Sequence, residues 1–190
     1  IAPDKAQETA YLPPLSDLAP EAIRGRIEEC GIVGMGGAGF PTHVKLRPSV
    51  PVDTLIVNGA ECEPYLTCDD ALMRAKTDEI VRGAKYLAAA LGVSQVLIAI
   101  EKNKPEAIAA FEQTELPVVP LKKQYPMGAE KQLIYCCTRR KVPLGKLPAD
   151  VGVIVQNVAT AFAVCEAVEL GKPLIERVVT VTEEGAENPK

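Results

Sequence analysis

The sequence predicts an α/β domain in which a mainly parallel sheet is covered by helices on both faces, as in Rossmann-like folds. Short, continuous apolar runs alternate along the chain with longer amphipathic segments. A continuous apolar run is typical of a strand buried on both faces, whereas the amphipathic segments have the spacing of helices. Because strands that alternate with helices form βαβ units, the sheet is expected to be mainly parallel.

The first half of the chain contains an extended lead-in, one helix and the first βαβ unit. Residues 1–19 are rich in proline and polar side chains, so we expect them to be extended. A helix is expected next, with Pro20 and Glu21 in its first turn. The first strand is then expected over 53–58, a long helix over 69–92 with Gly92 as its C-cap, and a second strand over 95–101.

The second half repeats this alternation and ends on a further β segment. A helix over 104–113 begins with Pro105, a position at which helices favour proline. The prolines of the strand over 117–121 place it near an edge of the sheet. A helix over 128–140, a strand over 151–156 and a helix over 158–171 follow. The main domain is therefore expected to span residues 20–174, and the β segment over 176–184 is expected to begin another module.

Composition argues against several classes of function. The 190 residues carry a formal net charge of −4, which disfavours a surface for nucleic acid or for an anionic membrane. Aromatic residues make up only 4% and tryptophan is absent, so a stacking surface for bases is hard to build. No apolar run reaches the roughly 18 residues of a transmembrane segment, and no signal peptide is visible. We interpret Ile1 in place of a methionine as the start of a processed or excised fragment.

The cysteines and the histidine do not form a recognisable metal site. No C-x-x-C pair occurs among the 6 cysteines, whereas zinc and iron–sulfur sites use such pairs. We therefore expect reduced, mostly buried thiols and no cluster in this chain. His43 is the only histidine, and we interpret it as structural. The stretch "ECEPYLTCDD" mixes hard and soft ligands, a combination that suits no common metal.

A glycine-rich loop is the first candidate for a binding site. Gly34, Gly36, Gly37 and Gly39 crowd into the stretch "GIVGMGGAGF", which ends on Phe40. Their spacing satisfies the G-x-G-x-x-G pattern, but in a dinucleotide site this pattern follows a strand. Here the preceding segment has helical spacing, so the loop is predicted to leave a helix. We interpret it as a backbone cradle for a phosphate or flavin, with a purely structural glycine turn as the alternative.

Polar side chains follow three predicted strands, at the edge where doubly wound sheets bind ligands. N-capping explains any one of them, but three clusters and the glycine loop at one edge favour a ligand site. Carboxylates there would accept hydrogen bonds from sugar hydroxyls or a ring N–H, and they would repel a phosphate. Lys45 is the expected cation for that phosphate, with a solvated surface lysine as the alternative. The clusters are Asn58, Glu61 and Glu63; Tyr125, Gly128 and Glu130; and Gln156, Asn157 and Thr160.

Four separated motifs resemble one known family, in the order in which that family has them. They are "GMGGAGFPTHVKL", "VNGAECEPYLTCDD", "YPMGAEKQLI" and "VQNVATAFAV". Together they resemble RnfC, a subunit of the Rnf ion-translocating electron-transport complex, and, more remotely, the flavin-bearing NADH-oxidising subunit of respiratory complex I. The resemblance implies a Rossmann-like domain that holds non-covalent FMN and exchanges hydride with NAD(H). It also implies that residues 175–190 begin a truncated β-grasp-like module, and that 4Fe-4S clusters belong to a part of the protein outside this chain.

The resemblance assigns cofactor-binding roles within these motifs and no catalytic side chain. Phe40 matches an aromatic residue that stacks on the adenine of NADH. Ala60 and Ala129 replace acids of the complex I subunit, and Met35 stands where that subunit has an arginine; these departures favour the Rnf-type branch. The residues that match the family's cofactor site are Gly34, Gly36, Gly37, Gly39, Phe40, Lys45, Asn58, Glu61, Glu63, Gly128, Glu130, Asn157 and Thr160.

The resemblance also indicates partners and a location. It implies NAD(H) and the other subunits of a membrane electron-transport complex as partners, with neither nucleic acid nor a transmembrane segment in this chain. The expected location is peripheral, on the cytoplasmic face of the inner (cell) membrane. Two other functions stay open: a flavin-dependent cobalamin reductase of propanediol-utilisation compartments, which shares the motifs, and a non-catalytic docking fragment.

Overall fold

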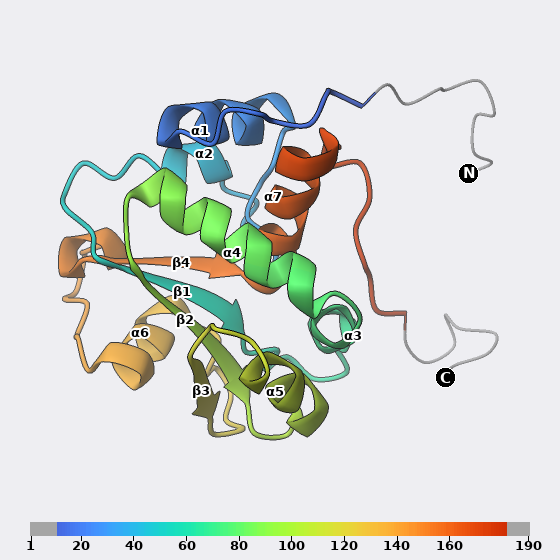
Figure 1. Ribbon diagram of the computed structural model, residues 1–190. Coiled ribbons are helices and arrows are strands. Elements are labelled where there is room, and N and C mark those ends of the chain that lie inside the picture. The colour runs from blue at the N-terminus through green and yellow to red at the C-terminus, as the bar shows by residue number, and fades with distance from the viewer. Residues whose placement is uncertain (1–10, 182–190) are drawn as a thin grey trace.

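A four-stranded sheet with the order β3-β2-β1-β4 forms the centre of the computed structural model, which describes residues 11–181 (Figure 1). All neighbouring strands are parallel, which confirms the predicted sheet. Along the chain, β2 and then β3 are added on one side of β1, and β4 pairs with the other side of β1. The carboxyl ends of β1 and β4 therefore form a topological switch point, where open parallel sheets bind ligands. The strands are β1 (Thr54–Gly59), β2 (Gln95–Glu101), β3 (Val118–Leu121) and β4 (Val153–Asn157).

Helices cover the two faces of the sheet unequally. Leu55 and Val57 of β1 point into a large apolar cluster, whereas Ile56 between them points into a smaller one. Only α6 (Glu130–Thr138), among the helices of residues 11–181, supplies buried side chains to the smaller cluster. The larger layer contains α1 (Pro20–Glu29), α2 (Thr42–Lys45), α3 (Cys68–Ala75), α4 (Thr77–Leu91), α5 (Pro105–Glu112) and α7 (Val158–Leu170); a 3₁₀ turn, η1 (Pro148–Val151), precedes β4.

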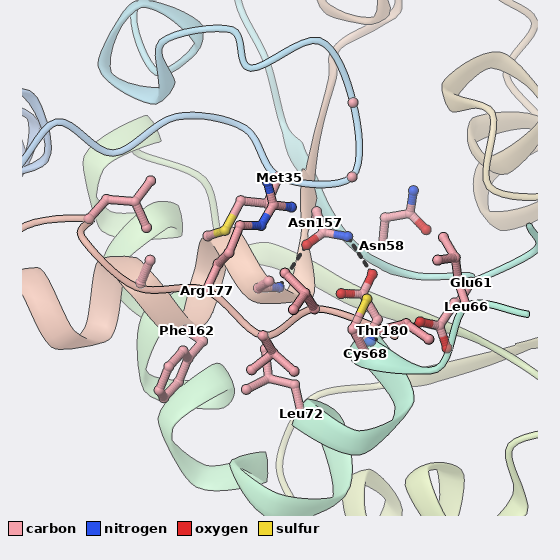
Figure 2. Close-up of a pocket in the computed structure, with 18 of the residues that line it drawn as sticks. Met35, Asn58, Glu61, Leu66, Cys68, Leu72, Asn157, Phe162, Arg177 and Thr180 are labelled. Carbon is pink, nitrogen blue, oxygen red and sulfur yellow. Dashed lines mark hydrogen bonds between the residues drawn. The ribbon is translucent and has the colours of Figure 1, made fainter. Parts of the chain in front are cut away.

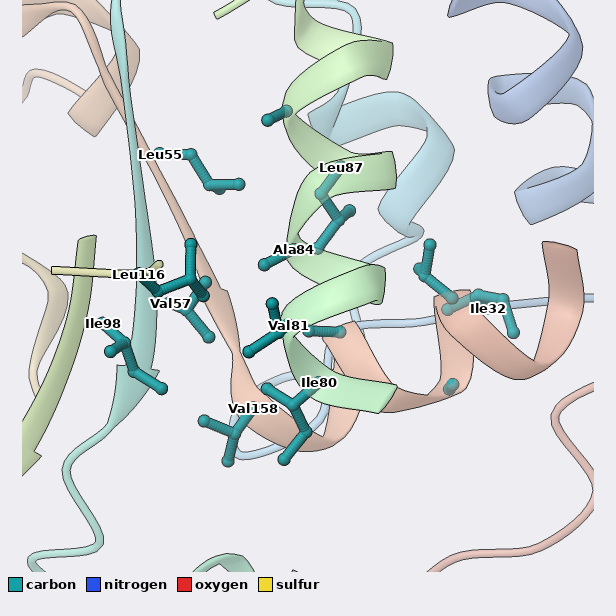
Figure 3. Packing of buried hydrophobic residues seen from close by; sticks show 14 of the residues in the cluster. Ile32, Leu55, Val57, Ile80, Val81, Ala84, Leu87, Ile98, Leu116 and Val158 are labelled. Carbon is teal, nitrogen blue, oxygen red and sulfur yellow. The ribbon is translucent and has the colours of Figure 1, made fainter. Parts of the chain in front are cut away.

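Helix α4 lies at the centre of the larger layer, between the sheet and α7. Figure 3 shows that Val81 and Ala84 face β1. It also shows Val158, which lies at the start of α7. On the side toward α7, Gly83 permits a very close approach, because a Cβ there would lie 1.8 Å from the carbonyl oxygen of Ala161. Packing against α4 thus fixes the position of α7, whose first residues stand at the switch point.

The prediction of one continuous helix over 69–92 is wrong, because the structure has two helices there, α3 and α4. Lys76 leaves the helical region with φ −134° and ψ 35°, between α3 and α4. Apolar spacing continues through the break, which is why periodicity did not reveal it. At the break, the hydroxyl of Thr77 donates to the carbonyl of Met73 at 2.7 Å, and at the start of α3 the buried carboxylate of Glu61 accepts the backbone N–H of Asp69 at 2.9 Å. Gly92 is the C-cap of α4, as predicted, with φ 71°.

Residues 11–17 agree with the predicted lead-in, whereas residues 176–181 do not form the predicted strand. The lead-in over 11–17 is extended, and the backbone of Leu12 and Leu15 bonds to the carbonyls of Gly171 and Val168. The β segment predicted over 176–184 does not form over 176–181, because no strand of the described residues pairs with it. Residues 182–190 lie outside the described residues, so the second module stays a prediction.

The cysteines are all free, but they are less buried than expected. Cys30 and Cys165 are buried, whereas the other four are half-buried, so the prediction of mostly buried thiols is wrong. Two of these four, Cys62 and Cys68, lie at the carboxyl edge of the sheet, where loops surround a cavity. None of the helices within residues 11–181 combines the length and the apolar character needed to cross a bilayer.

Candidate cofactor site

A cavity of about 870 Å³ opens at the carboxyl ends of β1 and β4 (Figure 2). Small-molecule sites typically have roughly 300–1,000 Å³, so a mononucleotide fits this space. Its walls are the glycine loop, the start of α3, the start of α7 and the segment that follows α7. Leu72, Phe162 and Ala163 give it an apolar side, and Asn58, Asp69 and Asn157 give it a polar one.

The glycine loop follows helix α1, as predicted, and is closed at its base. Gly34 N–H donates to the carbonyl of Phe40 at 2.8 Å, next to an antiparallel bridge between Val33 and Pro41. Gly36 has φ 77°, and a Cβ there would lie 2.8 Å from Nδ2 of Asn157. Gly37 lines the cavity with nothing within 4 Å of a Cβ position, so its backbone is open to a ligand.

The tip of the loop is attached to α7 by a second contact. Met35 N–H donates to Oγ1 of Thr160 at 2.9 Å, and Thr160 is fully buried. Thr160 therefore positions the loop and does not line the cavity. The loop and the first turn of α7 therefore border the cavity together, and a helix N-terminus favours an anion.

Asn157 and Asp69 form the centre of the polar wall. Asn157 is the N-cap of α7, as one of the two interpretations expected: its Oδ1 accepts the N–H of Ala159 at 2.7 Å. Its Nδ2 donates to Oδ2 of Asp69 at 2.7 Å. Burial raises the pKa of Asp69, with Asn157 acting against it, and the charges of Glu61 and Glu63 add to the rise. Sequence analysis did not identify Asp69 as a site residue, because an acid in the first turn of a helix is explained by helix stabilisation alone.

Asn58 joins two of the motifs directly. Its Nδ2 donates to the carbonyl of Gly128 at 3.0 Å, and its Oδ1 accepts the N–H of Ala60 at 2.9 Å. A Cβ at Gly128 would lie 2.7 Å from the carbonyl oxygen of Ala60, so only glycine fits this approach. The turn before α6 is thereby held against the end of β1, and both line the cavity.

The acids of the second motif have different environments. Glu61 is buried, accepts backbone N–H groups from the start of α3, and pairs with Lys104 at 2.8 Å. Its carboxylate is therefore already satisfied, although it borders the cavity. Glu63 is exposed at the cavity's edge. Glu63 and Asp69 are thus the carboxylates with capacity left to accept hydrogen bonds from a ligand.

The structure brings about half of the predicted site residues to the cavity. Lys45 and Glu130 bind each other at 2.5 Å, linking α2 to α6, and neither lines it. Phe40 is 54% exposed, outside the lining. Predicted residues that line the cavity are Gly36, Gly37, Asn58, Glu61, Glu63, Gly128 and Asn157; those that do not are Gly34, Gly39, Phe40, Lys45, Glu130 and Thr160.

The last wall of the cavity comes from a segment without any motif. Residues 172–180, here called the strap, run beside the opening, and Figure 2 shows Arg177 and Thr180 within this wall. The backbone N–H of Thr67 donates to Oγ1 of Thr180 at 3.0 Å. No sequence signal pointed to Arg177, because its approach to the site depends on the path of the chain after α7.

A family comparison agrees with this geometry. The sequence profile of the Nuo51 FMN-binding domain matches residues 27–166, which include the glycine loop and the starts of α3, α6 and α7. The chain belongs to this family. The Nuo51-type assignment agrees with the more remote resemblance to the flavin-bearing subunit of complex I.

Named relatives of this Nuo51-type domain are subunits of ion-translocating complexes, which confirms the resemblance to RnfC. The C subunit of the ion-translocating oxidoreductase complex of Rhodobacter capsulatus is 50% identical over 94% of this chain and 36% of that protein. The C subunit of the proton-translocating ferredoxin:NAD(+) oxidoreductase complex of Clostridium ljungdahlii is 50% identical over 92% of this chain and 39% of that protein. The C subunit of the Na(+)-translocating ferredoxin:NAD(+) oxidoreductase complex of Acetobacterium woodii is 45% identical over 93% of this chain and 41% of that protein. The chain thus spans about two fifths of the length of these relatives.

A solved structure supports the fold of the Nuo51-type domain. A chain of an NAD+-reducing [NiFe]-hydrogenase in the H2-reduced state superposes with a TM-score of 0.69 at 26% identity. The match covers 78% of this chain and 30% of that chain.

Proposed function

We propose that this domain binds FMN at the switch point between β1 and β4 and serves as the NADH-linked electron-transfer module of an Rnf-type complex. The observation that carries the proposal is the convergence of Gly37, Asn58, Gly128 and Asn157 on one cavity of about 870 Å³. These residues come from four separated motifs, and the family to which the chain belongs is defined by FMN binding.

The residues present fit a flavin mononucleotide. The open backbone at Gly37 and the first turn of α7 suit a phosphate, because both offer N–H groups to an anion. The carboxylates of Glu63 and Asp69 suit the hydroxyls of a ribityl chain or a ring N–H. Leu72 and Phe162 offer apolar surface to a ring. Bound flavin would supply the exchange between two-electron hydride transfer and single-electron transfer.

The chain's own residues would bind and orient this cofactor. Asn58 holds the turn at Gly128 in place, and Asp69 holds the amide of Asn157, so the walls are positioned before a ligand arrives. Such positioning lowers the ordering cost of binding. Phe40, Lys45 and Glu130 remain proposed contacts of the flavin or of NAD(H), on the side of the glycine loop that faces α2 and α6.

Partners and location follow from the relatives and are part of the proposal. The relatives' names support assembly with the other subunits of an ion-translocating complex, with NAD(H) and ferredoxin as electron carriers. Iron–sulfur clusters would belong to parts of the protein outside this chain. We place the domain peripherally on the cytoplasmic face of the inner membrane. The relatives favour this function over a cobalamin reductase or a docking fragment.

Titration of the flavin-free protein with FMN tests the function. The protein should quench flavin fluorescence with one FMN per chain and, once loaded, should be reduced by NADH in a stopped-flow experiment. Gly37→Val should weaken FMN binding by at least ~10-fold without loss of thermal stability, since Gly37 lines the cavity and no protein atom lies within 4 Å of its Cβ position. A protein that cannot be loaded with FMN would contradict the proposal.

A further inference from the structure

We propose that the strap closes the cofactor cavity and that Arg177 supplies the positive charge that binds a phosphate group of the nucleotide. This inference rests on the proposed function and names a binding residue that none of the four motifs contains. The ligand chemistry is a phosphate ester or pyrophosphate, as in FMN or NAD(H).

The strap is held against the domain along its length. The N–H of Leu174 donates to the carbonyl of Cys30 at 2.9 Å, just before the glycine loop. Lys172 pairs with Glu166 of α7 at 2.9 Å and with Glu176 at 2.8 Å. Near its other end, Thr180 accepts the N–H of Thr67 at 3.0 Å. Arg177 lies between these attachments, so its position over the cavity is defined by contacts on both sides.

The charges of the cavity wall single out Arg177. The acids that border the cavity are Glu61, Glu63, Asp69, Glu166 and Glu176, and a phosphate entering beside them would be repelled. Two cations border it within the described residues, Lys172 and Arg177. Lys172 is already bound by two carboxylates, whereas Arg177 forms no salt bridge among residues 11–181, and its charge acts on Asp69 by opposing the rise in the pKa of that carboxyl.

Cations outside the cavity are no substitute for Arg177. Lys45 is bound to Glu130, and Lys104 is bound to Glu61 at 2.8 Å; neither borders the cavity. A guanidinium also suits the task, because its planar array of donors can bind two phosphate oxygens at once.

The direction of the Arg177 side chain agrees with this role. Figure 2 shows it extending from the strap toward Met35 of the glycine loop and close to Asn157. Gly37 and Ala159, in the first turn of α7, border the same cavity. A phosphate bound there would meet backbone N–H groups on one side and a guanidinium on the other.

Comparing FMN with riboflavin isolates the phosphate. In the full-length protein freed of flavin, Arg177→Gln should weaken FMN binding by ~10- to 100-fold, as expected for a charge-assisted contact, and change riboflavin binding less than ~2-fold. Arg177→Lys should restore part of the difference. Arg74→Gln, which removes a surface arginine away from the cavity, is the matched control and should change neither affinity.

Titration with NAD+ distinguishes the two sources of the phosphate. A loss of affinity for FMN alone assigns Arg177 to the flavin phosphate, and a loss for NAD+ alone assigns it to the pyrophosphate. Equal losses for FMN and riboflavin, or unchanged affinity for FMN and NAD+, would overturn the inference and leave the proposed function intact. A wild-type protein that binds neither flavin would overturn both.

Discussion

Helices α4 and α7 cross at Gly83, where an added methyl group would lie 1.8 Å from the carbonyl oxygen of Ala161 and 2.6 Å from its carbonyl carbon. Both atoms belong to the backbone, so no side-chain rotation relieves the contact. To restore ordinary van der Waals distance, from 1.8 to 3.4 Å, the helices would have to shift by about 1.6 Å. The close packing of the core resists such a shift.

The free-energy change in Gly83→Ala combines two opposing effects. Overpacking a well-packed core costs ~1–3 kcal/mol, and a clash with backbone belongs at the upper end. Replacing glycine by alanine inside a helix contributes up to ~1 kcal/mol in the other direction. The net expectation is a loss of ~2 kcal/mol. For a chain of this length, that corresponds to a Tm lower by ~4–8 °C.

Urea and thermal denaturation of the purified chain would measure this loss. The matched control is Gly25→Ala in the middle of α1, where a Cβ would meet nothing within 4 Å and stability should rise by up to ~1 kcal/mol. Because α7 begins at the cofactor cavity, Gly83→Ala should also weaken FMN binding. Wild-type stability in Gly83→Ala, beside a stabilised Gly25→Ala, would refute the close crossing of the two helices.

Three further predictions concern the site and the thiols. Gly36→Ala should lower FMN affinity by ~10-fold in a fluorescence titration, because it puts a side chain at φ 77° and against the Asn157 amide, whereas Gly39→Ala, with φ 69° and no close atom, should add strain without that contact. Asp69 has a raised pKa in the folded state, which therefore binds more protons than the unfolded state, so its contribution to stability falls as pH rises from the unfolded to the folded pKa. The stability difference between Asp69→Asn and the wild type should accordingly grow in the variant's favour across that window, and a pH-independent difference in urea titrations would contradict it. Burial raises the pKa of Cys165 to about 12, so its thiol should resist a disulfide reagent at pH 8 in the folded chain and react once the chain is denatured; rapid labelling in the folded chain would show that the thiol is accessible.

Local sequence patterns predicted most of the elements and their parallel arrangement. Strands buried on both faces appear as continuous apolar runs, and their alternation with helices leaves a parallel sheet as the arrangement that fits. Local chemistry was equally readable: Gly92 ends α4, Asn157 caps α7, and the glycine loop leaves a helix. Each of these depends on residues only a few positions apart, so the signal lies within the motif itself.

Which functional side chains meet depends on how the chain packs in three dimensions. Glu61 is bonded to the start of α3 and to Lys104, and Lys45 is bonded to Glu130, contacts that the motifs did not indicate. Arg177, which follows the last motif, also borders the cavity. The ion pairs of Glu61 and Lys45 join residues tens of positions apart, and their energies depend on burial and distance, which the fold alone sets. The motifs therefore indicate the edge of the sheet, and the packing around it determines which charges remain available to a ligand.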